Sequence, residues 1–208
     1  NLRVHICPAD LSRDEDLERL ADALQHDAIT VDFLINNAGV GDRGDFATSE
    51  PQRLKDIALV NIISVTLLTR QLLPPMIERR RGAILNVSSS ASFLPIPRMA
   101  VYAASKAYVT SLSEALRSEV AEFGITVTAL CPGPVHTEFD TVAMRPHDPK
   151  RKAPEFTYVP VEEVVRAALD GVERNRPIII PGVAMKVAML FARLLPMPVL
   201  RLASRLSP

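Results

Sequence analysis

Short apolar runs alternate with longer helical stretches along most of this chain. The runs have the length and composition of buried strands, and they occupy residues 2–7, 31–36, 83–87, 126–131 and 177–180. Parallel strands need a crossover between them, usually a helix, so such a sheet is covered on both faces. The alternation therefore predicts an α/β fold, with a doubly wound parallel sheet between layers of helices.

Length and charge limit the classes of protein that fit. A chain of 208 residues is long enough for one domain with a sizeable core. We assign residues 1–182 to this domain and residues 183–208 to an amphipathic helical tail. The 24 basic and 24 acidic residues balance, which argues against a nucleic-acid partner. We predict no metal site.

Targeting segments and the positions of the cysteine residues are informative about the cellular compartment of the protein. No basic-then-apolar leader opens the chain, and no uncharged run reaches the roughly 18 to 20 residues of a membrane-spanning helix. Cys7 and Cys131 both lie in apolar runs, which favours buried structural thiols over a disulfide. These features predict a cytoplasmic protein.

One helical stretch carries a pair of residues suited to proton transfer. Tyr102 and Lys106 are four positions apart, so both side chains share one helix face. A neighbouring ammonium lowers the pKa of a phenol, normally about 10, and makes it usable as an acid or base. Ser89, thirteen residues before Tyr102, could donate a second hydrogen bond to the same substrate oxygen. By itself, the pair also fits a surface tyrosine beside a solvated lysine.

Further motifs accompany this pair. The segment LINNAG covers residues 34–39, Asn61 lies in a helical run, and CPGPVHT covers residues 131–137. With Ser89 and the Tyr-x-x-x-Lys pair, these motifs resemble, in order and spacing, the marks of the short-chain dehydrogenase/reductase family. The resemblance implies a Rossmann-like fold and an NAD(P)-dependent oxidoreductase that interconverts a ketone and a secondary alcohol.

The resemblance also implies a catalytic set of four residues. Ser89 would orient and polarise the substrate carbonyl, and Tyr102 would transfer the proton. Lys106 would lower the tyrosine pKa and hold the nicotinamide ribose. Asn61 would support a water that links Lys106 to solvent; the alternative is a purely structural mid-helix asparagine.

Cofactor contacts are implied for several loops at the carboxyl ends of the strands. The candidate cofactor-binding residues are Asp10, Leu11, Asn37, Ala38, Gly39, Tyr102, Lys106, Pro132, Gly133, Val135 and Thr137. Asp10 with Leu11 would meet the adenine, and Asn37, Ala38 and Gly39 would line the adenine-ribose side. Val135 with Thr137 would anchor the carboxamide. Asn37 could equally satisfy backbone groups at the sheet edge. The cofactor would be NADP or NAD, and the many reductases of the family favour NADP.

One family motif is missing from the printed sequence. Family members begin with a strand, a Thr-Gly-x-x-x-Gly-x-Gly turn, a helix and a second strand, and the eight glycines of this chain include no such cluster. The turn holds the cofactor pyrophosphate. Two explanations stay open: the chain is part of a protein longer by roughly 40 to 60 residues, the size of a strand-helix-strand unit, or it is a truncated, non-catalytic fragment or binding subunit.

The composition of the tail suggests which substrate and which partners the protein binds. It combines apolar residues with Lys186, Arg193, Arg201 and Arg205 and contains no acidic residue, so it could lie on a lipid surface or close over a long apolar substrate. The alternative is a helix docked on its own protein or on a dimer mate. From the resemblance we expect a bulky apolar substrate such as a lipid ketone, and a role in lipid metabolism.

We also expect a homodimer or homotetramer, because the family resemblance suggests that two helices pair with a symmetry-related copy. The apolar residues that would form this contact are Leu67, Leu68, Leu72, Leu73, Val109, Leu112, Leu116 and Val120.

Overall fold

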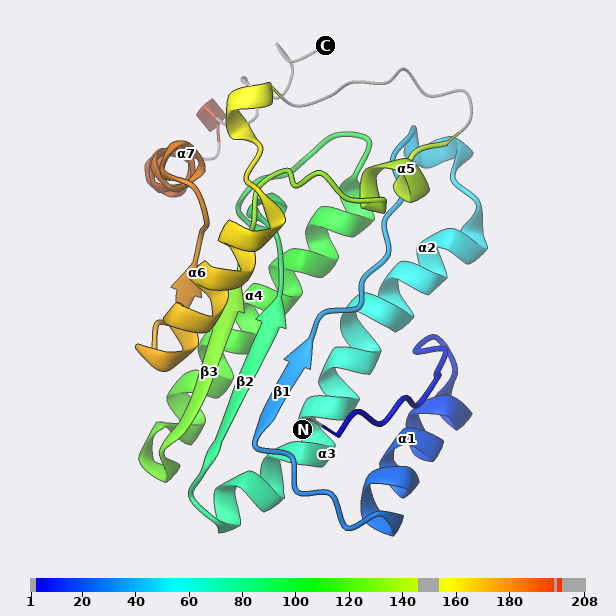
Figure 1. The fold of residues 1–208 in the computed structure, drawn as a ribbon. Helices are drawn as coiled ribbons and strands as arrows, with labels where there is room; N and C mark the ends of the chain where they lie inside the picture. Colours follow the sequence, from blue (N-terminus) through cyan, green and yellow to red (C-terminus); the bar gives the residue numbers. More distant parts are fainter. Residues whose placement is uncertain (1–2, 146–153, 197, 200–208) are drawn as a thin grey trace.

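The computed structural model describes residues 3–145, 154–196, 198 and 199. In this part of the chain, parallel strands form a 4-stranded sheet in the order β1-β2-β3-β4 (Figure 1). The strands are β1 (Phe33–Asn36), β2 (Gly82–Val87), β3 (Ile125–Leu130) and β4 (Ile178–Ile179). The predicted parallel sheet is thus confirmed, and each of these strands lies within a residue or two of an expected run.

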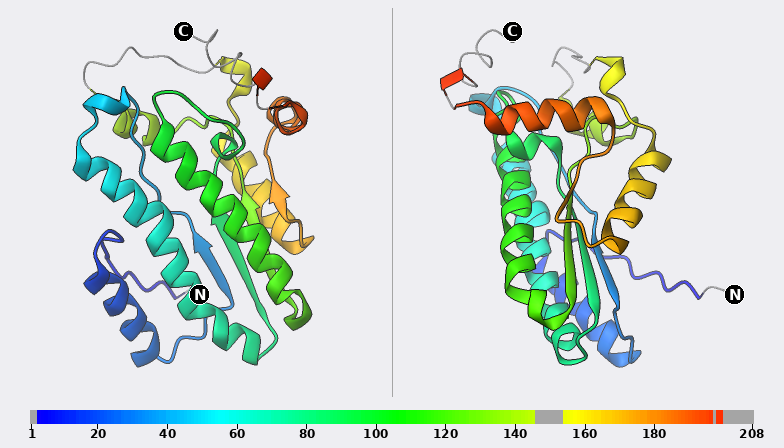
Figure 2. Two further views of the ribbon diagram at one scale, coloured as in Figure 1. Left: turned by 180° about the vertical axis from the view of Figure 1, so that it is seen from behind. Right: turned by 90° about the vertical axis from the view of Figure 1, so that its left-hand side faces the viewer.

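Helices cover both faces of the sheet, as the alternating pattern predicts. α3 (Ser64–Glu78) and α4 (Ala100–Val120) lie on one face, and α6 (Val161–Glu173) lies on the other (Figure 2). Successive residues of β2 point to opposite sides. Ile84 packs with side chains of α3 and α4, whereas Leu85 packs with side chains of α6. The two resulting clusters form the core of a three-layer, Rossmann-like arrangement.

A long helix leads from β1 to β2. It consists of α2 (Pro51–Ala58), a π-helical turn (Leu59–Ile63) and α3. The sequence predicts a break near Ile57, and the irregularity is the π turn. Proline lacks the N–H that a helix interior needs, so the sequence predicts an interruption at Pro74 and Pro75; this prediction is wrong, because the helix runs through both prolines. Proline fits the helical φ angle, and the fully buried Met76 holds this end of the helix against the sheet.

This long helix also has the length and composition of a membrane-spanning segment. Among the described residues, Pro51–Glu78 is the one helix that is long and apolar enough to cross a membrane. A core helix passes the same test, and this helix contacts β1, β2 and α4. One side of this helix therefore packs into the fold, while only 33% of its most apolar stretch is buried within the described chain.

The prediction of a strand at residues 2–7 is wrong. Residues 3–8 extend away from the body of the molecule (Figure 2), and Val4 and Ile6 are 78% and 86% exposed. A strand needs a hydrogen-bonded neighbour, and no described strand pairs with this segment. Cys7 is consequently exposed, whereas Cys131 is buried as predicted. The segment leads into α1 (Asp14–His26), which lies beside α3.

The carboxyl ends of the strands carry the remaining elements. Short helical turns lie there at η1 (Phe46–Thr48), η3 (Ser90–Phe93) and η5 (Glu155–Thr157), and α5 (Phe139–Ala143) follows the loop after β3, whereas η4 (Ala121–Phe123) lies at the other end, between α4 and the start of β3. The predicted tail begins with the helix α7 (Val183–Leu194). Its cationic residues Arg201 and Arg205 lie outside the described residues.

Candidate active site

The serines that follow β2 take different roles. Ser88 is buried; it donates to the backbone oxygen of Lys106 at 2.8 Å and shares a hydrogen bond of 2.7 Å with Thr110. Ser89 caps η3, and its Oγ accepts from the backbone N–H of Ala91 at 3.1 Å. Within the described part of the chain, the Ser89 hydroxyl proton has no acceptor. Ser89 can therefore donate to a ligand oxygen. Ser88 could do so only by losing its buried hydrogen bond to the Lys106 backbone oxygen.

Tyr102 and Lys106 share one face of α4, as their spacing predicts. Both side chains are buried, and Lys106 Nζ lies 5.9 Å from the centre of the Tyr102 ring. Nζ donates to the backbone oxygen of Val87, the last residue of β2, at 2.8 Å. Burial disfavours the ammonium and lowers the pKa of Lys106 to about 8. The lysine therefore stays mainly charged at neutral pH, near the phenol.

Asn61 lies in the π turn and is fully buried. Its amide group bonds both the N–H and the carbonyl oxygen of Val40 at 2.9 Å, and it also donates to the Ser105 hydroxyl at 3.0 Å. These bonds fix the loop after β1 against α4. A π-helical turn often marks a functional position, because it turns a side chain out of the regular helical register. The expected water-holding role of Asn61 stays a prediction.

The groups around Lys106 leave room and donors for a polar ligand. A lysine ammonium has three donors, and among the described residues Nζ has one acceptor, the Val87 oxygen. Gly39 lies beside it: a Cβ atom added there would stand 3.1 Å from Lys106 Nζ and 3.5 Å from Asn61 Oδ1. Any side chain at Gly39 would crowd the ammonium. The donor set and the bare backbone therefore fit the ribose hydroxyls of a nicotinamide cofactor.

The residues expected on the adenine side lie in a separate place. Leu11, Asn37 and Ala38 line a groove of about 280 Å³ between β1, α1 and α3. Asp10 is next to Leu11, but its carboxylate accepts from the Ser12 hydroxyl and N–H at 2.7 and 3.0 Å. The side-chain bond and then the backbone bond from Ser12 lower the pKa of Asp10. Its adenine contact stays a prediction.

The loop after β3 reaches the serine loop and α7. The backbone oxygen of Pro132 accepts from the N–H of Ser90 at 2.8 Å. A Cβ atom at Gly133 would stand 2.7 Å from the Met185 side chain of α7. A side chain at Gly133 would therefore require the flexible Met185 side chain to move, and a cofactor contact of this residue remains a prediction.

The same loop continues towards Tyr102. Val135 packs against the core cluster on the α6 face, and the Thr137 hydroxyl accepts from the N–H of Phe139 at 3.4 Å. The Phe139 ring lies 5.3 Å from the ring of Tyr102. Phe139 therefore brings the Val135–Thr137 loop to the candidate catalytic helix, while the expected carboxamide contacts remain predictions.

A buried ion-pair cluster that sequence analysis missed joins the loop after β1 to the region of α5. The Asp42 carboxylate accepts from Arg145 Nε at 2.9 Å, and Arg53 Nε lies 3.5 Å from it. Arg145 also donates to Ser49. The hydrogen bond from Arg145, together with bonds and charges from Ser49 and Arg53, holds the pKa of Asp42 below its usual range.

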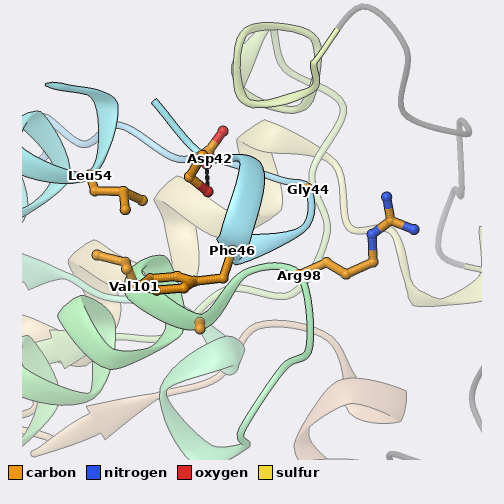
Figure 3. Close-up of a pocket in the computed structure, with 8 residues that line it drawn as sticks. Asp42, Gly44, Phe46, Leu54, Arg98 and Val101 are labelled. Atoms are coloured by element: carbon orange, nitrogen blue, oxygen red, sulfur yellow. Dashed lines mark hydrogen bonds between the residues drawn. The ribbon is translucent and has the colours of Figure 1, made fainter. Parts of the chain in front are cut away.

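This cluster supports one wall beside the candidate catalytic helix. Asp42 borders a cavity of about 20 Å³ that is also lined by Phe46 and by Val101, the residue before Tyr102 (Figure 3). The cavity holds about one water molecule, so it is not a substrate pocket. The sequence offers little signal for this cluster, because Asp42 stands in a Gly- and Asp-rich loop 103 residues from Arg145.

Comparison with known proteins places this geometry in a family. A short chain dehydrogenase family model matches residues 1–147. The ketoacyl reductase HetN of Nostoc sp. is 35% identical over 143 residues, which are 69% of this chain and 50% of that protein. The short-chain dehydrogenase from Sphingobium yanoikuyae in complex with NADPH has a TM-score of 0.75 and 31% identity, covering 90% of this chain and 72% of that one.

A further solved structure, the bulky-bulky ketone specific alcohol dehydrogenase from Comamonas testosteroni, has a TM-score of 0.71 and 30% identity, over 89% of this chain and 70% of that one. The chain spans about half the length of the curated relatives it matches. The family model nevertheless covers the strands, helices and loops that carry Asn61, Ser89, Tyr102 and Lys106. The chain belongs to the short-chain dehydrogenase family.

Proposed function

We propose that the protein is an NAD(P)-dependent oxidoreductase that interconverts a ketone and a secondary alcohol. The observation that carries this proposal is the grouping of Tyr102 and the charged Lys106 on one face of α4, next to the serine loop. The backbone N–H of Ala91 donates to the Ser89 hydroxyl, and Ala91 also packs against Tyr102. Ala91 therefore keeps the two candidate hydrogen-bond donors, Ser89 and Tyr102, close to each other.

Each residue of the set has a distinct task. In the reduction direction, the Ser89 hydroxyl donates a hydrogen bond to the carbonyl oxygen, and the Tyr102 phenol delivers the proton to that oxygen. The Lys106 ammonium stabilises the phenolate that remains. A bound nicotinamide supplies or accepts the hydride. Asn61 holds the Val40 backbone, which keeps Gly39 beside Lys106.

The cofactor proposal rests on the free donors of Lys106 and the bare backbone of Gly39. Within it, Leu11, Asn37 and Ala38 serve the adenine side, and the loop from Pro132 to Thr137 serves the carboxamide side. NADP is our preference over NAD, and the NADPH bound by the Sphingobium relative supports it.

For the substrate we propose a bulky, apolar ketone or the corresponding alcohol. The Nostoc relative is a ketoacyl reductase, and the Comamonas relative is specific for bulky-bulky ketones. Close to Tyr102, α5 adds the aromatic ring of its first residue, Phe139. An apolar wall of this kind favours an apolar substituent, since each buried methylene contributes about 0.8 kcal/mol.

We further propose that the protein assembles as a homo-oligomer, through a contact that differs from the set of residues predicted from the sequence. Leu68, Val109 and Val120 are buried inside the protomer and cannot reach a partner. Ile63 and Leu67 on the outer side of the long helix are 41% and 45% exposed, so they are the proposed contact.

The proposal is tested by turnover of the whole protein with reduced cofactor and a bulky ketone. Ser89→Ala and Tyr102→Phe should each lower kcat by about 10² to 10⁴-fold, the usual range for a lost acid or donor. Ser90→Ala is the matched control and should retain activity. The alternative function is that of a non-catalytic binding subunit. Titration of the protein with cofactor in a calorimeter distinguishes this alternative from the enzyme. A whole protein that binds neither NADPH nor NADH would remove the enzyme proposal.

A further inference from the structure

The helix α7 carries two apolar faces. One face packs onto the protein: Met185, Met189 and Ala192 are buried and form a cluster with Phe93, Leu94 and Ile180. This face is sufficient to hold the helix in place, because a single apolar stripe is what a surface helix normally buries.

The opposite face is also apolar, but it is exposed. Five residues at helical spacing form this second stripe, and each is between 48% and 80% exposed: Val183, Val187, Leu190, Phe191 and Leu194. We call them the α7 stripe. The turn η5 contacts α7 and carries a further exposed apolar residue, Phe156, which is 77% exposed. Contiguous apolar patches of this kind usually mark an interaction surface.

The charges around the α7 stripe are positive. Lys186 and Arg193 are exposed and lie one helical heptad apart, beside the stripe; the Arg193 guanidinium also lies over the Phe93 ring of η3, 5.5 Å from its centre. From residue 174 to the end, the sequence has Lys and Arg but no Asp or Glu. An acidic residue, Glu155, lies in η5, the turn that contacts α7, and it hydrogen-bonds to His136 at 3.0 Å, so it adds one negative charge near the two cations of α7. The two cations outnumber it, so the surface is suited to an anionic partner.

The orientation of α7 suits a flat partner. Figure 2 shows α7 lying across the carboxyl end of the sheet, at a steep angle to the strands. Because the Met185 face points towards η3, the α7 stripe points away from the molecule. The whole stripe can therefore meet one plane at the same time, at the end of the sheet where Ser89 and Tyr102 lie.

We propose that α7 docks the protein on an anionic lipid surface, with the α7 stripe in the interface and Lys186 and Arg193 at the headgroups. A second copy of the chain fits less well, since a two-fold contact through α7 would bring these cations together with no carboxylate on α7 to pair them. In this proposal, residues 1–182 form the catalytic domain, and α7, at the start of the tail assigned to residues 183–208, makes the membrane contact.

Co-sedimentation with lipid vesicles tests the proposal without any enzymatic reaction. The whole protein should sediment with vesicles of phosphatidylcholine and phosphatidylglycerol, less with pure phosphatidylcholine, and less at high salt. Leu190→Ser with Phe191→Ser should weaken binding by at least about a hundredfold, because two apolar side chains lose their insertion. Lys186→Gln with Arg193→Gln should weaken it by about thirtyfold.

The matched control lies on α6, where Val165 and Leu169 are 50% and 48% exposed among acidic neighbours. Val165→Ser with Leu169→Ser should bind vesicles as the wild type does. Circular dichroism and thermal unfolding should show that all variants fold, since every substituted side chain is at the surface. Three results would overturn the proposal: no sedimentation of the wild type with anionic vesicles, wild-type binding by the Leu190/Phe191 variant, or a wild-type dimer that this variant converts to a monomer without any vesicle binding.

Discussion

Replacing Lys106 by methionine should stabilise the protein while abolishing turnover. The pKa of Lys106 falls from 10.5 to about 8 because the ammonium is buried, a difference of 2.5 units. At 1.36 kcal/mol per unit, the buried charge costs about 3 kcal/mol. Lys106→Met removes this cost and loses the bond from Nζ to the Val87 oxygen, worth about 1 kcal/mol. The net gain at pH 7 is about 2 kcal/mol, or roughly 4 to 8 °C in Tm.

The sign of the pH dependence follows from the lowered pKa. Below pH 8 the lysine is charged in both the folded and the unfolded chain, so the burial cost is fully present. Between pH 8 and 10.5 the unfolded chain binds more protons than the folded one, and the cost disappears as pH rises. The stability advantage of Lys106→Met should therefore shrink between pH 7 and pH 10.

Urea unfolding at both pH values measures this difference directly. Lys55→Met, at an exposed position of α2, is the control and should change the free energy of unfolding by less than about 0.5 kcal/mol. A Lys106→Met variant no more stable than the wild type at pH 7, or equally stabilised at both pH values, would refute the reasoning that burial of the charge governs this site.

Three further substitutions have defined outcomes. Tyr102→Phe should lower kcat by about 10² to 10⁴-fold yet leave the cofactor Kd nearly unchanged in calorimetry, because the phenol acts on the substrate oxygen. Gly39→Ala places a Cβ atom 3.1 Å from Lys106 Nζ, so the cofactor Kd should rise. Asp42→Asn should lower the free energy of unfolding by about 1 to 3 kcal/mol at pH 7. Since the pKa of Asp42 is lowered from 3.8, that difference should fade in urea titrations as pH drops below 3.8.

The parts that could be predicted from sequence depend on local patterns. Apolar runs at 83–87 and 126–131 form strands because their side chains are buried on both faces of the sheet. The spacing of Tyr102 and Lys106 fixes their shared helix face whatever the tertiary contacts are. The thirteen-residue offset selects Ser89, and the structure agrees with that choice to the extent that the Ser88 hydroxyl is already hydrogen-bonded inside the protein; the catalytic role of Ser89 stays a prediction.

The parts that could not be predicted depend on partners distant in sequence. The run at 2–7 has strand composition, but composition alone cannot supply the neighbouring strand that its backbone needs. Asn86 stands in an apolar run, yet it accepts from Asn36 at 2.8 Å and donates to Ser113 at 2.9 Å. The Asp42–Arg145 contact likewise joins two loops that only the fold brings together.

The central claim, hydride exchange between a nicotinamide and a ketone at the Ser89–Tyr102–Lys106 site, is tested most directly by isotope transfer. The whole protein is given reduced cofactor labelled with deuterium at nicotinamide C4, on the transferred face, together with a bulky apolar ketone. The alcohol product is then examined by mass spectrometry and NMR. The account predicts deuterium on the carbinol carbon with wild-type protein and almost none with Tyr102→Phe in the same time. Alcohol formed without deuterium at that carbon, or equal labelling by both proteins, would contradict it.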